Sequence, residues 1–221
     1  MRLSFKKIVK DQRITEFIEQ SAKVLKFEGY TEHGFRHCEL AATRARYIAR
    51  KVGLSARDQE LAAVAGYCHD IGNFLGRTQH HYWSALLFSQ LYLDKYDYAE
   101  VAEVMQAIAN HDKEEMKLSS AISAAVVLAD KADVHRDRVV VQDMQEVRKD
   151  IHDRVNYATT ESKLTVSPKK KEIKLSLKID TEFVPIMEYF EIFTDRMSYC
   201  RKAAEFLGCK FALEINKVKL L

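Results

Sequence analysis

The most restrictive feature of this sequence is its shortage of glycine and proline. The 221 residues include only seven Gly and two Pro, whereas average usage would give roughly fifteen and eleven. Between Arg77 and Leu207 there is no Gly at all. This pattern excludes collagen-like chains, Gly/Pro-rich disordered chains and turn-dense all-β folds, and it favours long helices. We therefore expect a mainly α-helical protein.

The composition also narrows the range of partners and compartments. Hydrophobic residues make up 47% of the chain, enough for a sizeable core, and a net charge of +3 is too small for a dedicated nucleic-acid binder. No apolar run approaches the ~18 residues of a membrane span, and charged residues follow Met1 in place of an apolar signal core. The four cysteines form no C-x-x-C pair, which favours reduced, mostly buried thiols. We expect a cytoplasmic protein without a membrane or nucleic-acid partner.

Apolar residues at helical spacing predict most of the secondary structure. A Ser55 and Asp58 pair resembles a capping box and predicts one helix start. A long charged helix is expected to follow the last apolar one and to run to about Tyr157. The predicted apolar helices cover residues 11–26, 38–51, 56–69, 81–93, 98–111 and 120–133.

The pattern changes at Ala158, where apolar and polar residues begin to alternate with the period of a strand. Two alternating segments, 163–166 and 172–179, flank a Ser-Pro-Lys-Lys-Lys turn and predict a hairpin. A helix is expected over about 182–207, and residues 211–219 alternate again. The tail is therefore expected to form a small ββαβ unit. We expect two domains, a helical core over residues 1–157 and this unit over 158–221.

A His-Asp pair stands where its helix should be apolar. His69 and Asp70 close the segment Ala62-Ala-Val-Ala-Gly-Tyr-Cys, and no Lys or Arg lies near them in the sequence. A buried carboxylate costs several kcal/mol unless a cation compensates it. The pair therefore predicts a metal ion.

The same anomaly recurs in other predicted helices. Asp130 and Asp133 fall on the apolar stripe that begins with Ile122, which places a carboxylate on the packing face. His111 extends the inward stripe of its helix, and His37 lies in register with the buried face of the second helix. These residues are candidate ligands for the same ion or ions.

One further helix opens with two histidines. His80 and His81 precede Trp83, Leu86 and Leu87, which we expect to point inward. Taken together, four imidazoles and two carboxylates suit a transition metal better than Ca²⁺ or the all-oxygen site of Mg²⁺. Six side chains are enough for two ions.

At this point the sequence resembles the HD-domain superfamily of metal-dependent phosphohydrolases, over about residues 30–140. It has the extended H…HD…H…H…D form and is similar to HD proteins that hydrolyse diadenosine tetraphosphate and to the HD region of exopolyphosphatases. Asn73 follows the HD pair where guanosine-tetraphosphate hydrolases have a Glu-Asp pair, which argues against that activity. The motifs are His37-Cys-Glu-Leu-Ala-Ala, Cys68-His69-Asp70-Ile-Gly72, Gln79-His80-His81, Ala109-Asn-His111 and Leu128-Ala-Asp130-Lys-Ala-Asp.

The resemblance implies an HD helical bundle with two divalent ions, drawn from Mn, Fe, Ni, Co and Zn, with Mg as a further option. His80 is preferred to His81 as a ligand because Ser84 and Ala85 then fall where the family has a small pair, and His81 becomes the substrate-facing alternative. One ion would be held by His37, His69, Asp70 and Asp130, and the second by His80 and His111 with Asp70 bridging.

The resemblance also implies catalytic and substrate-binding residues. Two such ions can hold a bridging hydroxide in line with a phosphorus, so Asp70 is assigned to catalysis. Lys131 and Arg136 form the preferred pair for the charge on the phosphoryl group, and Asp133 would orient a ligand or protonate a leaving group. The residues assigned to substrate are Arg77, His81, Lys113, Lys131 and Arg136.

The predicted function is hydrolysis of a phosphomonoester or phosphoanhydride of a small, nucleotide-like molecule. Two alternatives stay open. The same six ligands occur in HD-type mixed-valence di-iron oxygenases, and the tail with its Lys169–Lys171 turn could belong to a non-catalytic nucleotide- or RNA-binding module. The tail could equally cover the core, form a homodimer interface or shape substrate entry.

Overall fold

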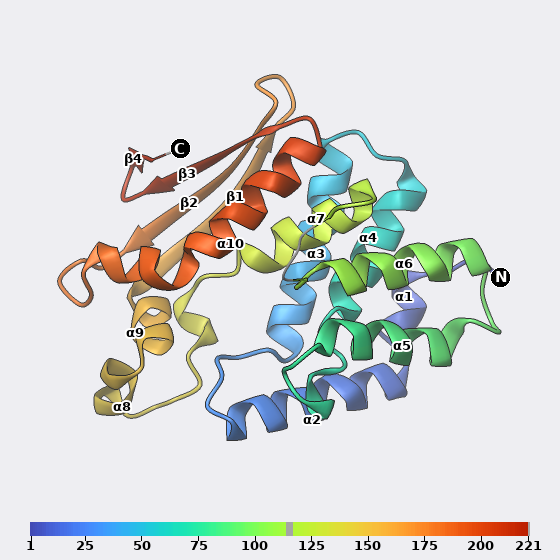
Figure 1. Ribbon diagram of the computed structural model, residues 1–221, viewed down its shortest axis with the longest axis horizontal. Helices are drawn as coiled ribbons and strands as arrows, with labels where there is room; N and C mark the ends of the chain where they lie inside the picture. The colour runs from blue at the N-terminus through green and yellow to red at the C-terminus, as the bar shows by residue number, and fades with distance from the viewer. Residues whose placement is uncertain (114–116, 221) are drawn as a thin grey trace. The chain divides into compact units, whose positions relative to one another are not determined.

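The computed structural model describes residues 1–113 and 117–220 and is mainly helical (Figure 1). The chain divides into two compact units, Met1–Asp130 and Lys131–Leu221. The expected fold, mainly α with a small C-terminal β unit, is confirmed. The first unit contains α1 (Phe5–Ile8), α2 (Gln12–Phe27), α3 (Phe35–Lys51), α4 (Ala56–Cys68), the 3₁₀ turn η1 (Asn73–Leu75), α5 (His80–Tyr92), α6 (Tyr98–Asn110) and α7 (Ala121–Lys131), whose last residue begins the second unit.

The helices of the first unit begin where the sequence supplies side-chain caps. Ser55 accepts a hydrogen bond from the backbone N–H of Asp58 at the start of α4, as the capping-box pattern predicts. Asp11 and Asp97 cap α2 and α6 in the same way. These caps satisfy N–H groups that have no partner inside the helix.

Close packing of α3 against α4 sets the geometry of the first unit. Gly66 of α4 lies so near α3 that a Cβ there would be 2.8 Å from the carbonyl oxygen of Ala41. Ala41 and Ala45 are fully buried on the facing side of α3. Because the two backbones approach so closely at Gly66, His37 of α3 comes within reach of the end of α4.

Helix α5 presents a different face to the core from the one expected. Trp83 and Leu86 are 40% and 56% exposed, so the expectation that they point inward is wrong, and Leu87 is half-buried. The buried stripe instead follows His80, Ser84 and Phe88, spaced four residues apart from the first residue of the helix. An apolar stripe is thus left on the surface of α5.

The segment after α7 is not the long charged helix that we expected. It holds the 3₁₀ turn η2 (Arg136–Arg138), α8 (Met144–Lys149) and α9 (Ile151–Ala158). The guanidinium of Arg138 donates to the backbone carbonyl of Asp133 and pairs with its carboxylate at 3.3 Å, and these local bonds compete with helical ones. Three consecutive β-branched valines from Val139 onward further disfavour helix.

This segment packs within the second unit. Helix α9 contacts η2, α8, β1 and α10, which explains why the compact units divide after Asp130, earlier than the change of sequence pattern at Ala158.

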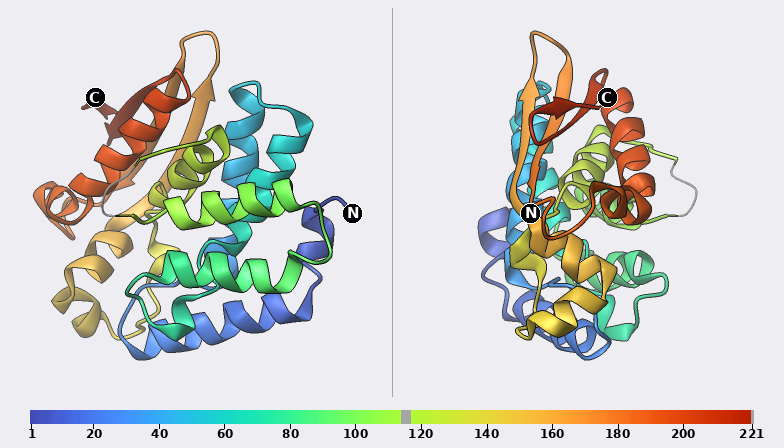
Figure 2. Two further views of the ribbon diagram at one scale, coloured as in Figure 1. Left: turned by 45° about the vertical axis from the view of Figure 1, so that its right-hand side comes forward. Right: turned by 90° about the vertical axis from the view of Figure 1, so that its left-hand side faces the viewer.

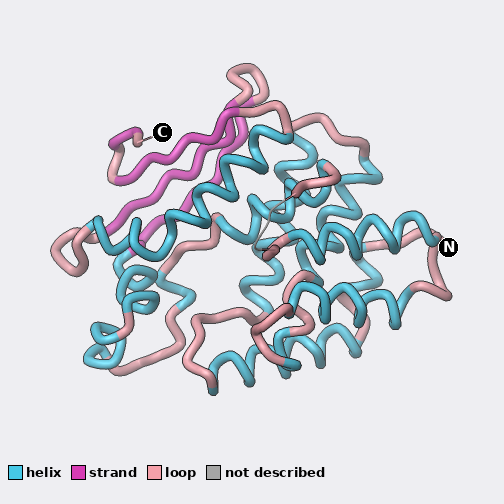
Figure 3. The backbone as a smooth tube through the Cα atoms, in the orientation of Figure 1, coloured by secondary structure: helices cyan, strands magenta, loops and turns pink. Residues whose placement is uncertain are grey.

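The second unit is built on a four-stranded sheet (Figures 1 and 3). Its strands are β1 (Thr159–Ser167), β2 (Glu172–Ile179), β3 (Lys210–Ile215) and β4 (Val218–Lys219). The β1–β2 hairpin is antiparallel, β2 and β3 are parallel, and β3 and β4 are antiparallel. Helix α10 (Ile186–Phe206) connects β2 to β3 and lies along one face of the sheet in both views of Figure 2.

The last predicted strand is interrupted. Asn216 and Lys217 have φ angles of 50° and 68°, so the chain reverses there and returns as β4 in place of one strand over 211–219. Across the two described ranges, we find no helix whose length and apolar content would suit a bilayer crossing.

Substituting Gly66 with Ala should push α3 and α4 apart. The added methyl group meets the Ala41 carbonyl oxygen at 2.8 Å, and overpacking of this kind costs about 1–3 kcal/mol. We expect a lower midpoint of thermal unfolding, measured by circular dichroism, and weaker binding of Mn²⁺ or Zn²⁺, measured by calorimetry, because His37 moves away from His69.

Gly53→Ala is the matched control for this substitution. Gly53 has a φ of +88°, and a Cβ there would have no described atom within 4 Å. Backbone strain of about 1–2 kcal/mol should lower stability to a similar extent, whereas metal binding should stay unchanged. Equal metal affinity in the two variants would contradict our inference that the close packing of α3 against α4 positions His37 for metal binding.

Candidate metal centre

The six side chains predicted as ligands lie together inside the first unit. All six are buried, with exposed fractions of 6% or less. They come from the start of α3, the end of α4, the start of α5, the end of α6 and the last turn of α7: His37, His69, Asp70, His80, His111 and Asp130.

The carboxylate of Asp70 lies at the middle of this cluster. Its Oδ2 is 3.3 Å from Nε2 of His69 and 3.7 Å from Nε2 of His37. Its Oδ1 is 3.1 Å from Nε2 of His80 and 3.5 Å from Nε2 of His111. Each oxygen thus faces its own pair of imidazoles.

Asp130 adds a second carboxylate on the side of His37 and His69. Its Oδ1 is 3.4 Å from Nε2 of His37 and 3.8 Å from Nε2 of His69. The half of the cluster around His37 and His69 therefore has two imidazoles and two carboxylates. The half around His80 and His111 has two imidazoles and the other oxygen of Asp70.

Backbone carbonyls hold three of the imidazoles in one orientation. Nδ1 of His69, His80 and His111 each lies within 2.9 Å of the carbonyl oxygen three residues earlier in the chain. Such bonds assign the proton to Nδ1 and leave Nε2 with a lone pair directed at the cluster. His69 and His111 follow the last residues of α4 and α6, where carbonyls without helical partners are available.

A short turn fixes the step from the His-Asp pair to α5. The backbone N–H of Gly72 donates to Oγ of Ser84 at 2.8 Å. A Cβ at Gly72 would lie 2.5 Å from the backbone nitrogen of Ser84. The turn therefore packs directly on the first turn of α5 and brings His80 close to Asp70. The small residue expected four positions after His80 is Ser84, and this contact gives it a structural role.

The cluster has the properties of a metal-binding site. Nε2 of His37 is 3.1 Å from Nε2 of His69, and Nε2 of His80 is 3.0 Å from Nε2 of His111. Two lone pairs at this distance repel unless a proton or a metal cation lies between them. Oδ1 of Asp70 is buried and, among the described residues, accepts no hydrogen bond of good geometry. A mixed set of imidazoles and carboxylates fits a divalent transition metal.

Ligand atoms within 4.8 Å of one another form three overlapping groups. Two of them correspond to the two halves of the cluster, and a third joins His69 and His111 across the halves. The groups are His37–His69–Asp70, Asp70–His80–His111 and His69–His111–Asp130.

Electrostatics distinguish the two halves. Burial alone would raise the pKa of Asp70, but the imidazoles around it, that of His69 foremost, hold the pKa well below its usual range. Burial disfavours the charged form of His69, yet the adjacent Asp70 carboxylate outweighs this effect and raises the pKa of His69. Burial lowers the pKa of His111 to about 4.

Three of the predicted substrate residues lie beside the His80 half. Arg77, His81 and Lys113 line, together with His80, a pocket of ≈ 720 Å³. Arg77 donates to Oδ1 of Asn73 at 2.9 Å, and its guanidinium is 3.1 Å from Nε2 of His80. His81 is outside the three ligand groups, which include His80.

The other three assigned residues belong to the second unit, and the catalytic and substrate-binding roles of all six residues stay predictions. Lys131 and Asp133 are buried, and Asp133 pairs with Arg138. Arg136 donates to the carbonyl oxygen of Tyr157 and lies over its ring.

One carboxylate beside the cluster is absent from the sequence prediction. Oδ2 of Asp112 is 3.6 Å from the guanidinium of Arg77 and 3.8 Å from Nε2 of His80. Asp112 lies just beyond the end of α6, where helical periodicity gives no signal. Its position next to His111 in the sequence is the feature that could have indicated it.

Comparison with known proteins identifies the segment that carries the cluster. Residues 34–136 match the family model of the HD domain. An uncharacterized protein of Methanocaldococcus jannaschii is 27% identical over 161 residues, which cover 62% of this chain and 61% of that protein, so the chain spans about three fifths of the relative's length. A solved structure described as a predicted HD superfamily hydrolase, from an uncultured Thermotogales bacterium, is 23% identical with a TM-score of 0.44, over 56% of this chain and 68% of that chain.

Metal binding at His69 should weaken on acidification before binding at His111 does. The adjacent Asp70 carboxylate raises the pKa of His69 above its usual range, so a proton competes with metal for Nε2 at a higher pH than at an ordinary imidazole, and below that pKa each pH unit should cost about tenfold in affinity. The pKa of His111 is lowered to about 4, so its Nε2 stays unprotonated through mildly acidic conditions.

Two single variants separate the halves in equilibrium dialysis with Zn²⁺ between about pH 7.5 and about pH 5.5. Binding that remains in His111→Ala depends on His69 and should fall steeply with acidification. Binding that remains in His69→Ala should fall less. The opposite order would show that the electrostatic difference between the halves is wrongly assigned.

Proposed function

This chain contains an HD domain, over residues 34–136, and from that premise we propose that it is a metal-dependent phosphohydrolase. The proposed substrate is a phosphomonoester or phosphoanhydride of a small, nucleotide-like molecule. The observation that carries the proposal is the position of Asp70, whose two oxygens each face a separate pair of imidazoles. One carboxylate placed in this way can serve two ions.

The two halves of the cluster define the proposed ligand sets. Bound divalent ions would supply positive charge for phosphate oxygens and would lower the pKa of water. Asp70 belongs to both sets in this proposal. The first set is His37, His69, Asp70 and Asp130, and the second is Asp70, His80 and His111.

Cationic side chains beside the His80 half support an anionic substrate. Arg77 and Lys113 line the same pocket as His80, and a guanidinium binds phosphate oxygens through two parallel hydrogen bonds. Asn73 and Asp112 contact the guanidinium of Arg77 and orient it. His81 is buried and lines the same pocket, and in this proposal it would donate a hydrogen bond to the substrate.

Lys131, Asp133 and Arg136 remain in the proposal as residues close in sequence to Asp130. A carboxylate paired with a buried guanidinium is a poor proton donor. The ion pair between Asp133 and Arg138 therefore favours an orienting role for Asp133 over protonation of a leaving group.

The experiment that tests the proposed function is a substrate and metal screen on anaerobically purified protein. We expect release of phosphate from nucleotides, dinucleoside polyphosphates or simple phosphate esters with Mn, Ni, Co, Fe, Zn or Mg. The nearly isosteric Asp70→Asn should reduce the rate by at least about 100-fold, since it removes the shared charge. Asp137→Asn, at a carboxylate that is 61% exposed, should retain the activity.

Two outcomes would contradict the proposal. A half-reduced di-iron signal in the EPR spectrum, with no phosphatase activity, would identify an oxygenase. Retention on RNA that survives Asp70→Ala, with no turnover of any phosphate ester, would identify a binding module.

The number of ions has a separate test. His111→Ala should lose one metal equivalent and keep the other, because His111 belongs only to the second proposed set, whereas Asp70→Ala should lose both. Metal content measured by mass spectrometry after dialysis gives the count. His152→Ala serves as the control because its side chain is 60% exposed, and two equivalents retained by His111→Ala would refute the two-ion assignment.

A further inference from the structure

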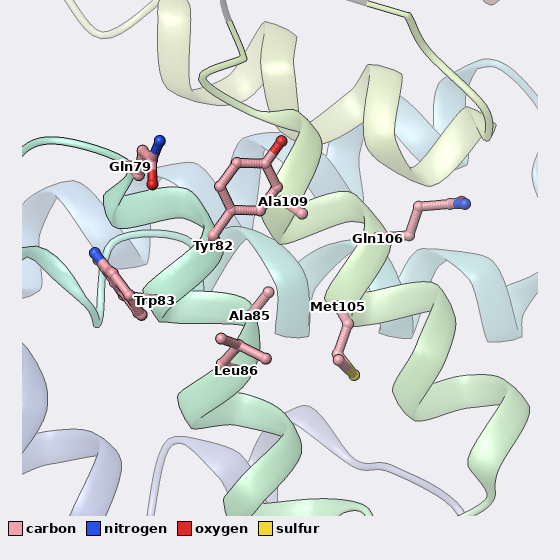
Figure 4. Close-up of a pocket in the computed structure, with 8 residues that line it drawn as sticks. All are labelled: Gln79, Tyr82, Trp83, Ala85, Leu86, Met105, Gln106 and Ala109. Carbon is pink, nitrogen blue, oxygen red and sulfur yellow. The ribbon is translucent and has the colours of Figure 1, made fainter.

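Helices α5 and α6 leave a groove on the surface of the first unit (Figure 4). Its volume is ≈ 520 Å³, which lies within the ordinary range for small-molecule sites. The residues that matter here are Gln79, Tyr82, Trp83 and Leu86 at the start and along one side of α5, and Met105 and Gln106 on α6.

The groove exposes apolar side chains that the fold does not need for its core. Tyr82, Trp83 and Leu86 are 43%, 40% and 56% exposed. With Gln79 they fall at helical spacing on one face of α5, opposite the stripe that carries His80, Ser84 and Phe88. Aromatic residues exposed side by side on a single helix face mark a contact surface for a ligand or partner.

The groove adjoins the pocket beside the His80 half of the cluster. Gln79 and Tyr82 line both cavities. The ammonium group of Lys113 lies 5.6 Å from the centre of the Tyr82 ring, and Arg77 also lines the pocket. One ligand could therefore place an anionic end beside His80 and a flat apolar end against α5 and α6.

Gln79 lies at the junction of the two cavities and has an unusual backbone conformation. Its φ of 57° is left-handed, which costs a non-glycine residue about 1–2 kcal/mol and is concentrated at ligand sites. Gln79 and Gln106 are both exposed and line the groove from its two sides (Figure 4). A carboxamide offers a donor and an acceptor that match the edge of a nucleobase, adenine above all.

We propose that this groove binds the nucleobase of the substrate, with a purine stacked against the aromatic residues of α5 and its phosphate in the adjoining pocket. The phosphate half of this assignment rests on the proposed phosphohydrolase function. Recognition of the base does not, because the groove contains none of the metal ligands.

The sole tryptophan of the chain makes the groove directly observable. Trp83 is the only Trp, so all tryptophan fluorescence comes from this surface. Titration of the full-length protein with adenosine should quench it saturably, and guanosine and cytidine establish the base preference. Ribose 5-phosphate, which has no base, should leave the fluorescence unchanged. Absence of saturable quenching by all three nucleosides at millimolar concentration would overturn the proposal.

Two variants of equal charge test the location. Leu86→Glu puts a carboxylate into the groove and should weaken adenosine binding by tenfold or more, and because adenosine is neutral this loss does not reflect repulsion of phosphate. Leu93→Glu makes the same change at the end of α5, outside the groove, at a residue that is 39% exposed, and binding should be unaffected. Equal affinities in the two variants would overturn the assignment to the groove.

Kinetics separate this proposal from the proposed function. Leu86→Glu should raise KM for a nucleoside phosphate about tenfold, whereas Leu93→Glu, outside the groove, should leave that KM unchanged. Saturable quenching by adenosine in a protein that hydrolyses no phosphate ester would uphold the groove and refute the hydrolase. Hydrolysis of ribose 5-phosphate without nucleoside binding would support the hydrolase and refute the assignment of the groove.

A second copy of the chain is the competing occupant. Sedimentation velocity of the wild type, Leu86→Glu and Leu93→Glu decides between them. A dimer that dissociates only in Leu86→Glu would show that the groove is a contact between copies and would overturn the proposal. A sedimentation coefficient that is the same in all three is the expected result.

Discussion

The carboxylate of Asp70, buried among imidazoles, is the constraint on which the first unit depends. A desolvated carboxylate costs several kcal/mol unless positive charge or hydrogen-bond donors surround it. The cationic side chain nearest in the sequence, Arg77, comes only to 3.7 Å from Oδ1 of Asp70, and the imidazoles of His69, His80 and His111 supply the closer contacts. The ends of α4, α5 and α6 are positioned accordingly, because a histidine can face Asp70 only if its helix begins or ends at the correct residue. Gly66 and Gly72 permit the close backbone approaches that this arrangement requires.

The buried His/Asp cluster could be predicted from the sequence because its side chains break a regular pattern. A carboxylate or imidazole on an apolar helical stripe is costly whatever the tertiary structure, so His37, His111 and Asp130 stand out without any knowledge of the fold. Asp112 does not stand out in the sequence, because a carboxylate just past the end of a helix is common. The pairing of Asp133 with Arg138 is likewise invisible in the sequence, because it replaces the helix that local charge patterning predicts.

Periodicity was less informative about which apolar residues are covered by the protein itself. The sequence of α5 is apolar on more than one face, and hydropathy alone assigns Trp83 and Leu86 to the core. The structure buries Phe88 instead, because the register of the helix is fixed by the position of His80. Hydrophobicity indicates that a side chain gains from being covered, and it does not say whether the cover is the protein's own core or a ligand.

This register gives α5 two separate tasks along one backbone. The stripe that begins at His80 faces Asp70 and the core, and the stripe that begins at Gln79 faces the groove. Both positions are fixed by the same first turn, so in the proposed complex the base in the groove and the phosphate beside His80 would be held at a constant separation. Since the outer stripe contributes little to the core, its side chains can change without moving a metal ligand. Under the proposed function, substitutions on the outer stripe would therefore alter which base is bound and leave the His80 side of the helix in place.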